Sequence, residues 1–318
     1  MRQRVLLPER IAGAGVNYLE NHGYEIVYGS RDPEDMIGKL SGCEAVITRN
    51  VRITKEMMLA APGLRVIARH GVGVDMIDTE AAKELGIWVT NAPESNTNAV
   101  AEQVIGAMLT VARKLILCND LVRRGDYDRR TQIGGMELAG KTLGVVGFGR
   151  IGRCVARKAA LGLDMAIAVY DPYLKEEPEE YGIQITESLE ELLRISDVVT
   201  LHVPLLESNR HMMGREQFLF MKEHGILINY ARGALTDQEA LAEALKEGRI
   251  AGAAVDVFEN EPVTADNPLC GLEQVLLTPH TASFTGESLD KMALHSAMTV
   301  HQVLSGQKPT WCVVAGYR

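Results

Sequence analysis

Residues 140–173, GKTLGVVGFGRIGRCVARKAALGLDMAIAVYDPY, decide the fold of this chain. An apolar run, LGVVG, leads into three glycines spaced as GxGxxG (Gly147, Gly149 and Gly152), then an amphipathic segment and a second apolar run, AIAVY. This order of strand, tight turn, helix and strand is typical of a dinucleotide-binding unit. The first glycine permits the turn, the second lets a pyrophosphate approach the backbone, and the third lets the helix pack closely on the strand.

The same stretch predicts the cofactor. The N-terminus of a helix offers unpaired N–H groups and a positive dipole end to phosphates. Asp171 ends the second strand, where its carboxylate would bind the adenosine ribose hydroxyls and repel the extra phosphate of NADP. Because no arginine immediately follows Asp171, we expect NAD rather than NADP. The alternative to dinucleotide binding is a glycine-rich turn in a plain α/β domain. The candidate cofactor ligands of this stretch are Gly147, Phe148, Gly149, Arg150, Ile151, Gly152 and Asp171.

Working outward, short β-branched runs alternate with amphipathic ones along the whole chain. Five such runs occupy the first ninety residues (RVLLP, EIVYG, AVITR, RVIAR, IWVTN) and six occupy residues 143–279 (LGVVG, AIAVY, VVTLH, ILINY, AAVDV, VLLTP). Near-continuous apolar strands separated by helices predict parallel sheets covered on both faces. Eleven strands are too many for one such sheet, so we expect two α/β domains, with a complete one before the glycine motif.

One long helical segment, starting near Ala99, is a candidate for the connection between the domains. Its apolar positions are Val100, Val104, Ala107, Met108 and Val111. They could pack in the core or form a dimer surface, and core packing is the use that we expect.

The composition excludes several classes of partner. The formal net charge is −9 and the pI is near 5.5, so nucleic acid and acidic membranes, which require a basic face, are not expected partners. Five scattered cysteines without a CxxC pair predict a reduced, cytoplasmic chain without a cysteine zinc site. The first residues do not form a signal peptide pattern, no apolar run approaches a membrane span, and no histidine motif predicts a metal site.

A single histidine, His280, follows the apolar run VLLTP. Groups at the carboxyl edge of a parallel sheet are placed for chemistry, although a lone histidine can also be a polar loop cap. The rest of the chain favours chemistry, because its motifs resemble those of the D-2-hydroxyacid dehydrogenase family. The matching motifs are GVGVDMID (71–78), VGFGRIG (146–152), LHVPL (201–205), NYARGALTDQEAL (229–241), AGAAVDVFENEP (251–262) and LLTPHTAS (276–283).

The resemblance covers essentially the whole chain and implies a fold. The chain is identified as a phosphoglycerate dehydrogenase-like member in the short form, without a regulatory domain. The expected fold is α/β with two doubly wound parallel-sheet domains. A flavodoxin-like substrate domain would be discontinuous, residues 1–98 plus 287–318, and a Rossmann NAD-binding domain would span residues 99–286. The family also implies a homodimer.

The resemblance also assigns the catalytic residues. Arg232 would bind the substrate carboxylate, His280 would be the acid or base, and Glu261 would orient its ring; these types suit the reduction of a 2-keto acid. Singly, each could be an ordinary surface or turn residue. Other implied positions are Val72 and Gly73 for the substrate carboxylate, Val203, Pro204 and Asn209 for the cofactor, and Ala231 and Asp256 for the nicotinamide end. Two residues depart from the pattern: Met76 replaces an asparagine, and Asn209 replaces a threonine.

The expected activity is hydride transfer between NAD(H) and a small D-2-hydroxy acid. Arg52, Arg69 and His70 lie near the presumed substrate loop. The run IARHGVGVD resembles that of phosphoglycerate dehydrogenase-like members, which implies a substrate with a phosphate or an extra carboxylate, while glyoxylate, hydroxypyruvate and longer 2-keto acids stay open. The alternative is an NAD-sensing binding protein on the same fold, similar to the corepressors that resemble this family.

Overall fold

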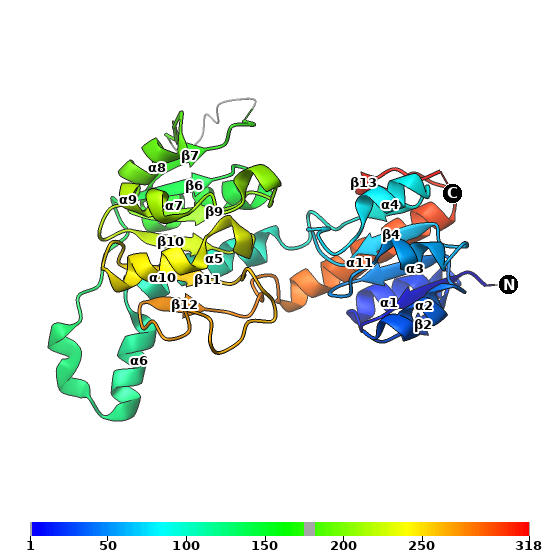
Figure 1. Cartoon of the computed structure of the whole chain (residues 1–318), viewed down its shortest axis with the longest axis horizontal. Coiled ribbons are helices and arrows are strands. Elements are labelled where there is room, and N and C mark those ends of the chain that lie inside the picture. Colours follow the sequence, from blue (N-terminus) through cyan, green and yellow to red (C-terminus); the bar gives the residue numbers. More distant parts are fainter. Residues whose placement is uncertain (1, 175–181, 318) are drawn as a thin grey trace. The chain divides into compact units, whose positions relative to one another are not determined.

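A computed structural model describes residues 2–174 and 182–317 of the chain. The chain divides into two compact units (Figure 1). Unit 1 consists of Met1–Asn96 and Ser283–Arg318, and unit 2 of Thr97–Ala282. The domain boundaries inferred from the sequence, at residues 98/99 and 286/287, stay a prediction.

Unit 1 is built on a six-stranded sheet in the order β13-β5-β4-β3-β1-β2. Its first five strands are parallel, whereas β13 pairs antiparallel with β5. The order 2-1-3-4-5 is that of a doubly wound, flavodoxin-like sheet. The strands are β1 (Arg4–Leu7), β2 (Glu25–Tyr28), β3 (Ala45–Thr48), β4 (Val66–Arg69), β5 (Trp88–Thr90) and β13 (Cys312–Val314).

Helices cover both faces of this sheet because alternate strand residues point to opposite sides. Val5 and Leu7 pack with the side of α1 (Gly13–Asn21) and α11 (Gly286–Leu304), whereas Leu6 packs on the other side. The helices on that other side are α2 (Pro33–Leu40), α3 (Lys55–Leu59) and α4 (Thr79–Glu84).

Unit 2 contains a seven-stranded sheet in the order β12-β11-β10-β9-β6-β7-β8, with every pair parallel. The strands are β6 (Thr142–Val146), β7 (Ala166–Tyr170), β8 (Gln184–Ile185), β9 (Val198–Leu201), β10 (Ile226–Asn229), β11 (Gly252–Val255) and β12 (Val275–Leu277). One face packs against α5 (Thr97–Ala112) and α7 (Arg150–Leu163), and the other against α8 (Leu189–Ile195), α9 (Arg215–Phe220) and α10 (Gln238–Lys246). The remaining elements are α6 (Leu115–Arg124) and the 3-10 turns η1 (Tyr127–Gln132), η2 (Glu207–Asn209) and η3 (Gly233–Leu235).

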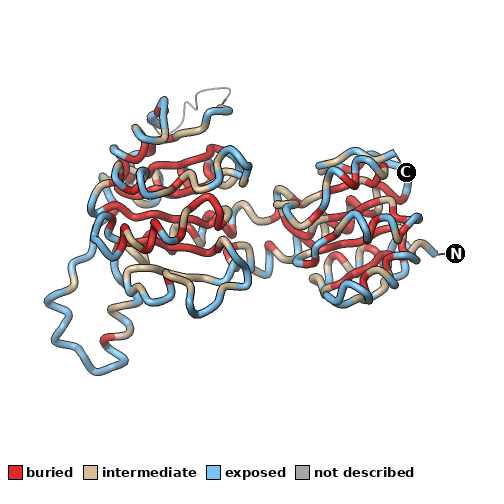
Figure 2. The backbone as a smooth tube through the Cα atoms, viewed as in Figure 1, coloured by how far each residue is buried: buried red, intermediate tan, exposed pale blue. Residues whose placement is uncertain are grey.

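Burial follows the strands in each unit (Figure 2). Residues of β3, β9, β10 and β11 are all buried, as expected for strands with helices on both faces. The apolar side of α5 lies in the core of unit 2, where Val100, Val104, Ala107 and Met108 are buried. Core packing is therefore the use that this helix makes of its apolar face. None of the helices within the described residues is long and apolar enough to cross a membrane.

The predicted fold class is confirmed, with two parallel-sheet α/β units and every one of the eleven expected strands present. The structure adds two edge strands that the sequence did not predict. β8 has two residues, and β13 has three and makes the sheet of unit 1 mixed rather than purely parallel.

Candidate active site

The glycine loop of unit 2 connects β6 to α7 and gives each glycine a different task. Gly147 has φ +91°, and a Cβ there would lie 2.7 Å from Val203 Cγ1 and 2.9 Å from the His202 carbonyl. At Gly152 a Cβ would lie 2.2 Å from the Gly147 carbonyl oxygen, so only glycine lets the helix pack on the loop. A Cβ on Gly149 would meet nothing within 4 Å. The space beside Gly149, next to a helix N-terminus without a side-chain cap, fits a pyrophosphate.

Asp171 is attached to this loop. Its Oδ2 accepts a hydrogen bond from Phe148 N at 2.8 Å, and its Oδ1 accepts one from Tyr173 N at 2.9 Å. The carboxylate therefore lies beside the glycine loop, and its bond to an adenosine ribose stays a prediction. Of the other loop residues, Arg150 is exposed and Ile151 half-buried at the start of α7.

The segment after β9 forms another wall of the same region. Val203 packs against Gly147, since a Cβ on that glycine would lie 2.7 Å from Val203 Cγ1. Pro204 is exposed. Asn209 has both polar atoms engaged: its Oδ1 accepts from Leu206 N at 2.7 Å and its Nδ2 donates to Pro204 O at 2.8 Å. The residue that replaces the expected threonine thus braces the Pro204–Leu206 turn from within.

His280 and Glu261 form a close pair. The His280 Nδ1 lies 2.8 Å from Glu261 Oε2, and the side chains are 53% and 37% exposed, so a ligand can reach the ring. Because a carboxylate only accepts, Nδ1 carries the proton and Nε2 is left to exchange a proton with a substrate. Burial raises the pKa of Glu261, but hydrogen bonds from His280 and Phe258 N and the charges of His280 and Arg232 outweigh it, so the pKa is below its ordinary value.

Asp256 holds the loop that carries His280. Its Oδ1 accepts from Thr281 N at 2.9 Å and from the Thr278 hydroxyl at 2.5 Å, and its Oδ2 accepts from Ala282 N at 2.9 Å. The backbone N–H of His280 donates to the Asp256 carbonyl at 2.7 Å. His280 has φ +54°, a left-handed conformation that is costly for a non-glycine residue. Asp256, itself 1% exposed, therefore fixes the backbone that presents the imidazole.

Arg232 is the third member of the expected set and follows β10. Its Nη1 donates to the Ala231 carbonyl at 2.7 Å, and its charge lowers the pKa of Glu261, so the two side chains are near each other. Ala231 N donates to Asn229 Oδ1 at 3.2 Å. Arg232, Glu261 and His280 thus lie near one another, and all the residues predicted to hold the cofactor belong to the same unit.

Val72 and Gly73, predicted for the substrate carboxylate, lie on unit 1 after β4. Arg69 braces this loop, since its Nε donates to Gly73 O at 2.7 Å and its Nη1 to His70 O at 2.8 Å. Asn91 Nδ2 donates to Val72 O at 2.8 Å. Side chains of unit 1 therefore hold the loop in place through its carbonyl groups.

Sequence reasoning missed the residues that organise the site through the backbone, notably Thr278 and Phe258. Neither had a signal beyond its place beside a predicted catalytic residue. Within the described ranges there is no cluster of three or more His, Cys, Asp or Glu that could hold a metal ion.

Known proteins share both the sequence and the fold. The family described as "D-isomer specific 2-hydroxyacid dehydrogenase, NAD binding domain" matches residues 105–282. The D-3-phosphoglycerate dehydrogenase of Methanocaldococcus jannaschii is 41% identical over 96% of this chain, which spans 58% of that protein's length. The glyoxylate reductase of Korarchaeum cryptofilum is 40% identical over 92% of this chain and 90% of its own length.

Solved structures agree with these sequence relatives. The TT0316 protein from Thermus thermophilus superposes with a TM-score of 0.91 at 37% identity, covering 98% of this chain and 100% of that one. An NADPH-dependent glyoxylate/hydroxypyruvate reductase from Sinorhizobium meliloti, in complex with NADP and malonate, gives 0.88 at 28% identity over 100% and 99%. The comparisons give no support to the corepressor-like alternative. On its sequence and its fold, the chain belongs to the D-isomer-specific 2-hydroxyacid dehydrogenase family.

Proposed function

We propose that this chain is an NAD-dependent dehydrogenase that interconverts a small D-2-hydroxy acid and its 2-keto acid. The observation that carries the proposal is the His280–Glu261 pair, 2.8 Å apart, in the same unit as Arg232 and a glycine loop shaped for a dinucleotide. Bound cofactor would supply or accept the hydride; proton transfer and substrate orientation are left to the protein.

The chemistry of each side chain matches one need of this reaction. The guanidinium of Arg232 is suited to a carboxylate or to a carbonyl oxygen that gains negative charge. In the reductive direction the Nε2–H of charged His280 donates the proton to that oxygen, and in the oxidative direction neutral Nε2 accepts it. Glu261 favours the charged ring and keeps the proton on Nδ1. Val72 and Gly73 would contribute backbone N–H groups to the substrate carboxylate.

A second anionic group on the substrate would suit Arg49, which follows β3 on unit 1. Its guanidinium stacks on the Phe284 ring at 4.4 Å and makes no ion pair with any described residue. The pKa of His70 is lowered to about 4, mainly by burial and then by the positive charges of Arg49 and Arg69. This effect of its charge places Arg49 near His70. Arg49 thus has free donors for a phosphate or a second carboxylate, and we favour a phosphoglycerate-like substrate over unsubstituted glyoxylate.

Asp171 supports NAD over NADP, because a carboxylate at the ribose position repels a 2′-phosphate.

The five cysteines are free in the structure, which supports a reducing, cytoplasmic setting.

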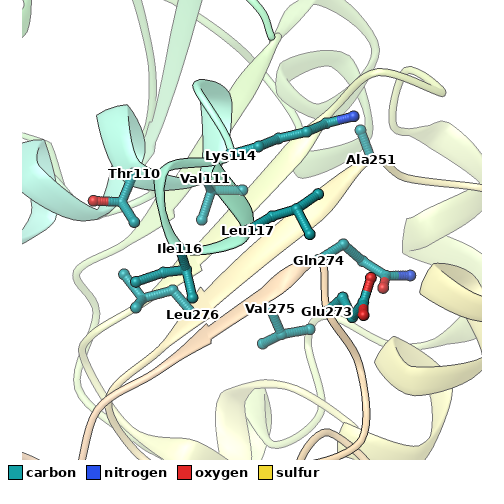
Figure 3. Close-up of a pocket in the computed structure, with 10 residues that line it drawn as sticks. All are labelled: Thr110, Val111, Lys114, Ile116, Leu117, Ala251, Glu273, Gln274, Val275 and Leu276. Carbon is teal, nitrogen blue, oxygen red and sulfur yellow. The ribbon is translucent and has the colours of Figure 1, made fainter. Parts of the chain in front are cut away.

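We also propose a homodimer whose interface includes α6 and η1. These elements form an extension of unit 2 (Figure 1), in which Ile116, Val122 and Tyr127 are 52%, 65% and 60% exposed. A ten-residue helix with a single buried residue, Leu121, is not stable in water without a partner surface. At its base, a cavity of about 240 Å³ is lined by apolar side chains of α5, α6 and β12 and by the polar side chains of Thr110, Lys114, Glu273 and Gln274 (Figure 3). A second copy of the chain could supply the covering surface, and V122E would then yield monomers in light scattering.

The test of activity is NADH oxidation at 340 nm with a panel of 2-keto acids: glyoxylate, hydroxypyruvate, phosphohydroxypyruvate, 2-ketoglutarate and 2-ketoisocaproate. His280→Ala is the control, and it should bind NADH but lose turnover. Turnover of phosphohydroxypyruvate that Arg49→Ala weakens far more than turnover of glyoxylate would support the second anionic group. If NADH binds and no acid on the panel is reduced, the proposed activity is wrong for this substrate class.

A further inference from the structure

Glu259, two residues before Glu261, forms another carboxylate–imidazole hydrogen bond, in this case with His211. Glu259 Oε2 lies 2.9 Å from His211 Nε2, and Glu259 Oε1 accepts a hydrogen bond from Gln238 N at 3.1 Å. Arg210 Nη2 lies 3.7 Å from the same carboxylate. Glu259 is largely buried, with 22% of its side chain exposed, whereas Arg210 is 50% exposed. Nothing in the proposed reaction uses this pair.

The His211 segment lies against the turn that carries Arg232. His211 N donates to Ala234 O at 2.8 Å, and Met213 N donates to Leu235 O at 3.0 Å. His211 has φ +52°, so its backbone is held in a left-handed conformation while its ring reaches Glu259. The segment therefore connects the residues just after Arg232 to the loop after β11.

That loop also touches the Arg232 turn directly. A Cβ added to Gly233 would lie 2.0 Å from the Phe258 carbonyl carbon, so the two backbones are in close contact. Phe258 N in turn donates to Glu261 Oε1 at 3.0 Å, and Glu261 binds His280. The catalytic carboxylate thus belongs to a loop that packs on the Gly233 backbone and is tied through Glu259 to His211 and Gln238.

We propose that His211 and Glu259 form a clasp that positions the Phe258–Glu261 loop, and through it the Glu261–His280 pair, relative to Arg232. The clasp joins three segments: the His211 segment, the N-terminus of α10 at Gln238 and the Glu261 loop. His211 and Glu259 are positioning residues, because the hydrogen bonds of their side chains are made to other groups of the protein. The proposal rests on the proposed dehydrogenase function.

The test compares four variants. Glu259→Ala removes both bonds, and His211→Gly removes only the imidazole, since glycine accepts the left-handed backbone. Glu259→Gln keeps bonding capacity, because its oxygen can accept from Gln238 N and its amide can donate to neutral Nε2. The matched control is His224→Ala, which deletes another imidazole–carboxylate bond of unit 2, the 2.7 Å contact with Asp197.

We expect Glu259→Ala and His211→Gly to lower kcat by roughly 10-fold to 100-fold while NADH binding is unchanged, because the reacting groups are misplaced and the cofactor site is not. The acid limb of the pH–rate profile should move to higher pH, since a Glu261 with weaker hydrogen bonds has a higher pKa. Glu259→Gln should recover most of the activity. His224→Ala should alter stability but neither kcat nor the acid limb.

A folded Glu259→Ala enzyme with the wild-type kcat and acid limb would overturn the clasp. A second readout does not depend on turnover: the histidine ring signals in 15N NMR, with His280 assigned by its loss in His280→Ala. That signal should shift in Glu259→Ala and His211→Gly and stay in place in His224→Ala. If it stays in place in all three, the clasp is wrong even where the chain reduces no tested acid, a result that would count separately against the proposed function.

Discussion

Asp197→Asn should destabilise unit 2 by an amount that the structure sets. Asp197 precedes β9, and its side chain is 7% exposed. It accepts hydrogen bonds from Thr142 N at 2.8 Å, Lys222 Nζ at 2.9 Å and His224 Nε2 at 2.7 Å. Asparagine has one acceptor oxygen and an amide that would face a cation, so it cannot replace all three bonds.

The pKa of Asp197 gives the magnitude. Burial raises it, but the bonds from Thr142, His224 and Lys222 outweigh burial and lower the pKa from 3.8 to about 2. At about 1.4 kcal/mol per pKa unit, the ionised carboxylate contributes roughly 2 kcal/mol to the free energy of unfolding. Because the folded pKa is depressed, this contribution is complete above the unfolded value of 3.8 and is lost as the pH falls toward 2. About half of it should remain near pH 3.

Urea unfolding followed by far-UV circular dichroism would measure the effect. Both tryptophans, Trp88 and Trp311, lie in unit 1, so tryptophan fluorescence reports that unit and provides an internal comparison. With a slope of about 2 kcal/mol per molar urea, the midpoint for unit 2 should fall by about 1 M at pH 7. Asp120→Asn is the control, because it affects only exposed contacts, at 4.0 Å with Arg124 and at 3.2 Å with Asn119 Nδ2. A loss no greater than that of the control, or a difference between Asp197→Asn and wild type that does not shrink at low pH, would refute the reasoning.

Three further predictions concern the site. Glu261→Gln should lower kcat at neutral pH without changing NADH affinity in a fluorescence titration, because the charge that favours protonated His280 is lost; equal losses in both would contradict this. Gly149→Ala and Gly152→Ala should both weaken NADH binding, but only Gly152→Ala should also lower the thermal midpoint of unit 2, since its Cβ would lie 2.2 Å from the Gly147 carbonyl oxygen. Asp171→Asn should shift the NADPH to NADH ratio of kcat/KM by roughly 10-fold or more toward NADPH, about 1.4 kcal/mol of discrimination; an unchanged ratio would remove Asp171 from cofactor choice.

The fold could be predicted because its strands are buried on both faces. Runs such as ILIN and AVIT are apolar except for their last residue and are buried along their whole length, and every such run is a strand in the structure. The two strands that were missed lie at sheet edges and depend on tertiary contacts. β8 has two residues, and β13 exists because residues after α11 return to pair with β5. Neither length nor composition distinguishes such segments from loop.

The site was predicted by motif rather than by geometry. Sequence spacing identifies His280, Glu261 and Arg232 as residue types that suit the chemistry, but not the bonds that orient them. Three features arise only in the folded chain: the left-handed backbone of His280, the bond from Phe258 N to Glu261 and the bracing of Pro204 by Asn209. Roles for these residues, and for Val72 and Gly73, stay predictions that the proposed kinetics would test.

Asp171 and Asp256 are both predicted to bind the cofactor, but they differ in how many acceptor positions of the carboxylate are already used within the protein. An ionised carboxylate offers about four acceptor positions. Asp171 uses two of them, on Phe148 N and Tyr173 N, so two are left, as many as the ribose has hydroxyls. Asp256 uses three, on Thr278, Thr281 N and Ala282 N, and the residue is 1% exposed. Because one acceptor position is left to offer a carboxamide, we expect Asp256 to act chiefly by holding His280 in place, and its contact with the nicotinamide stays a prediction.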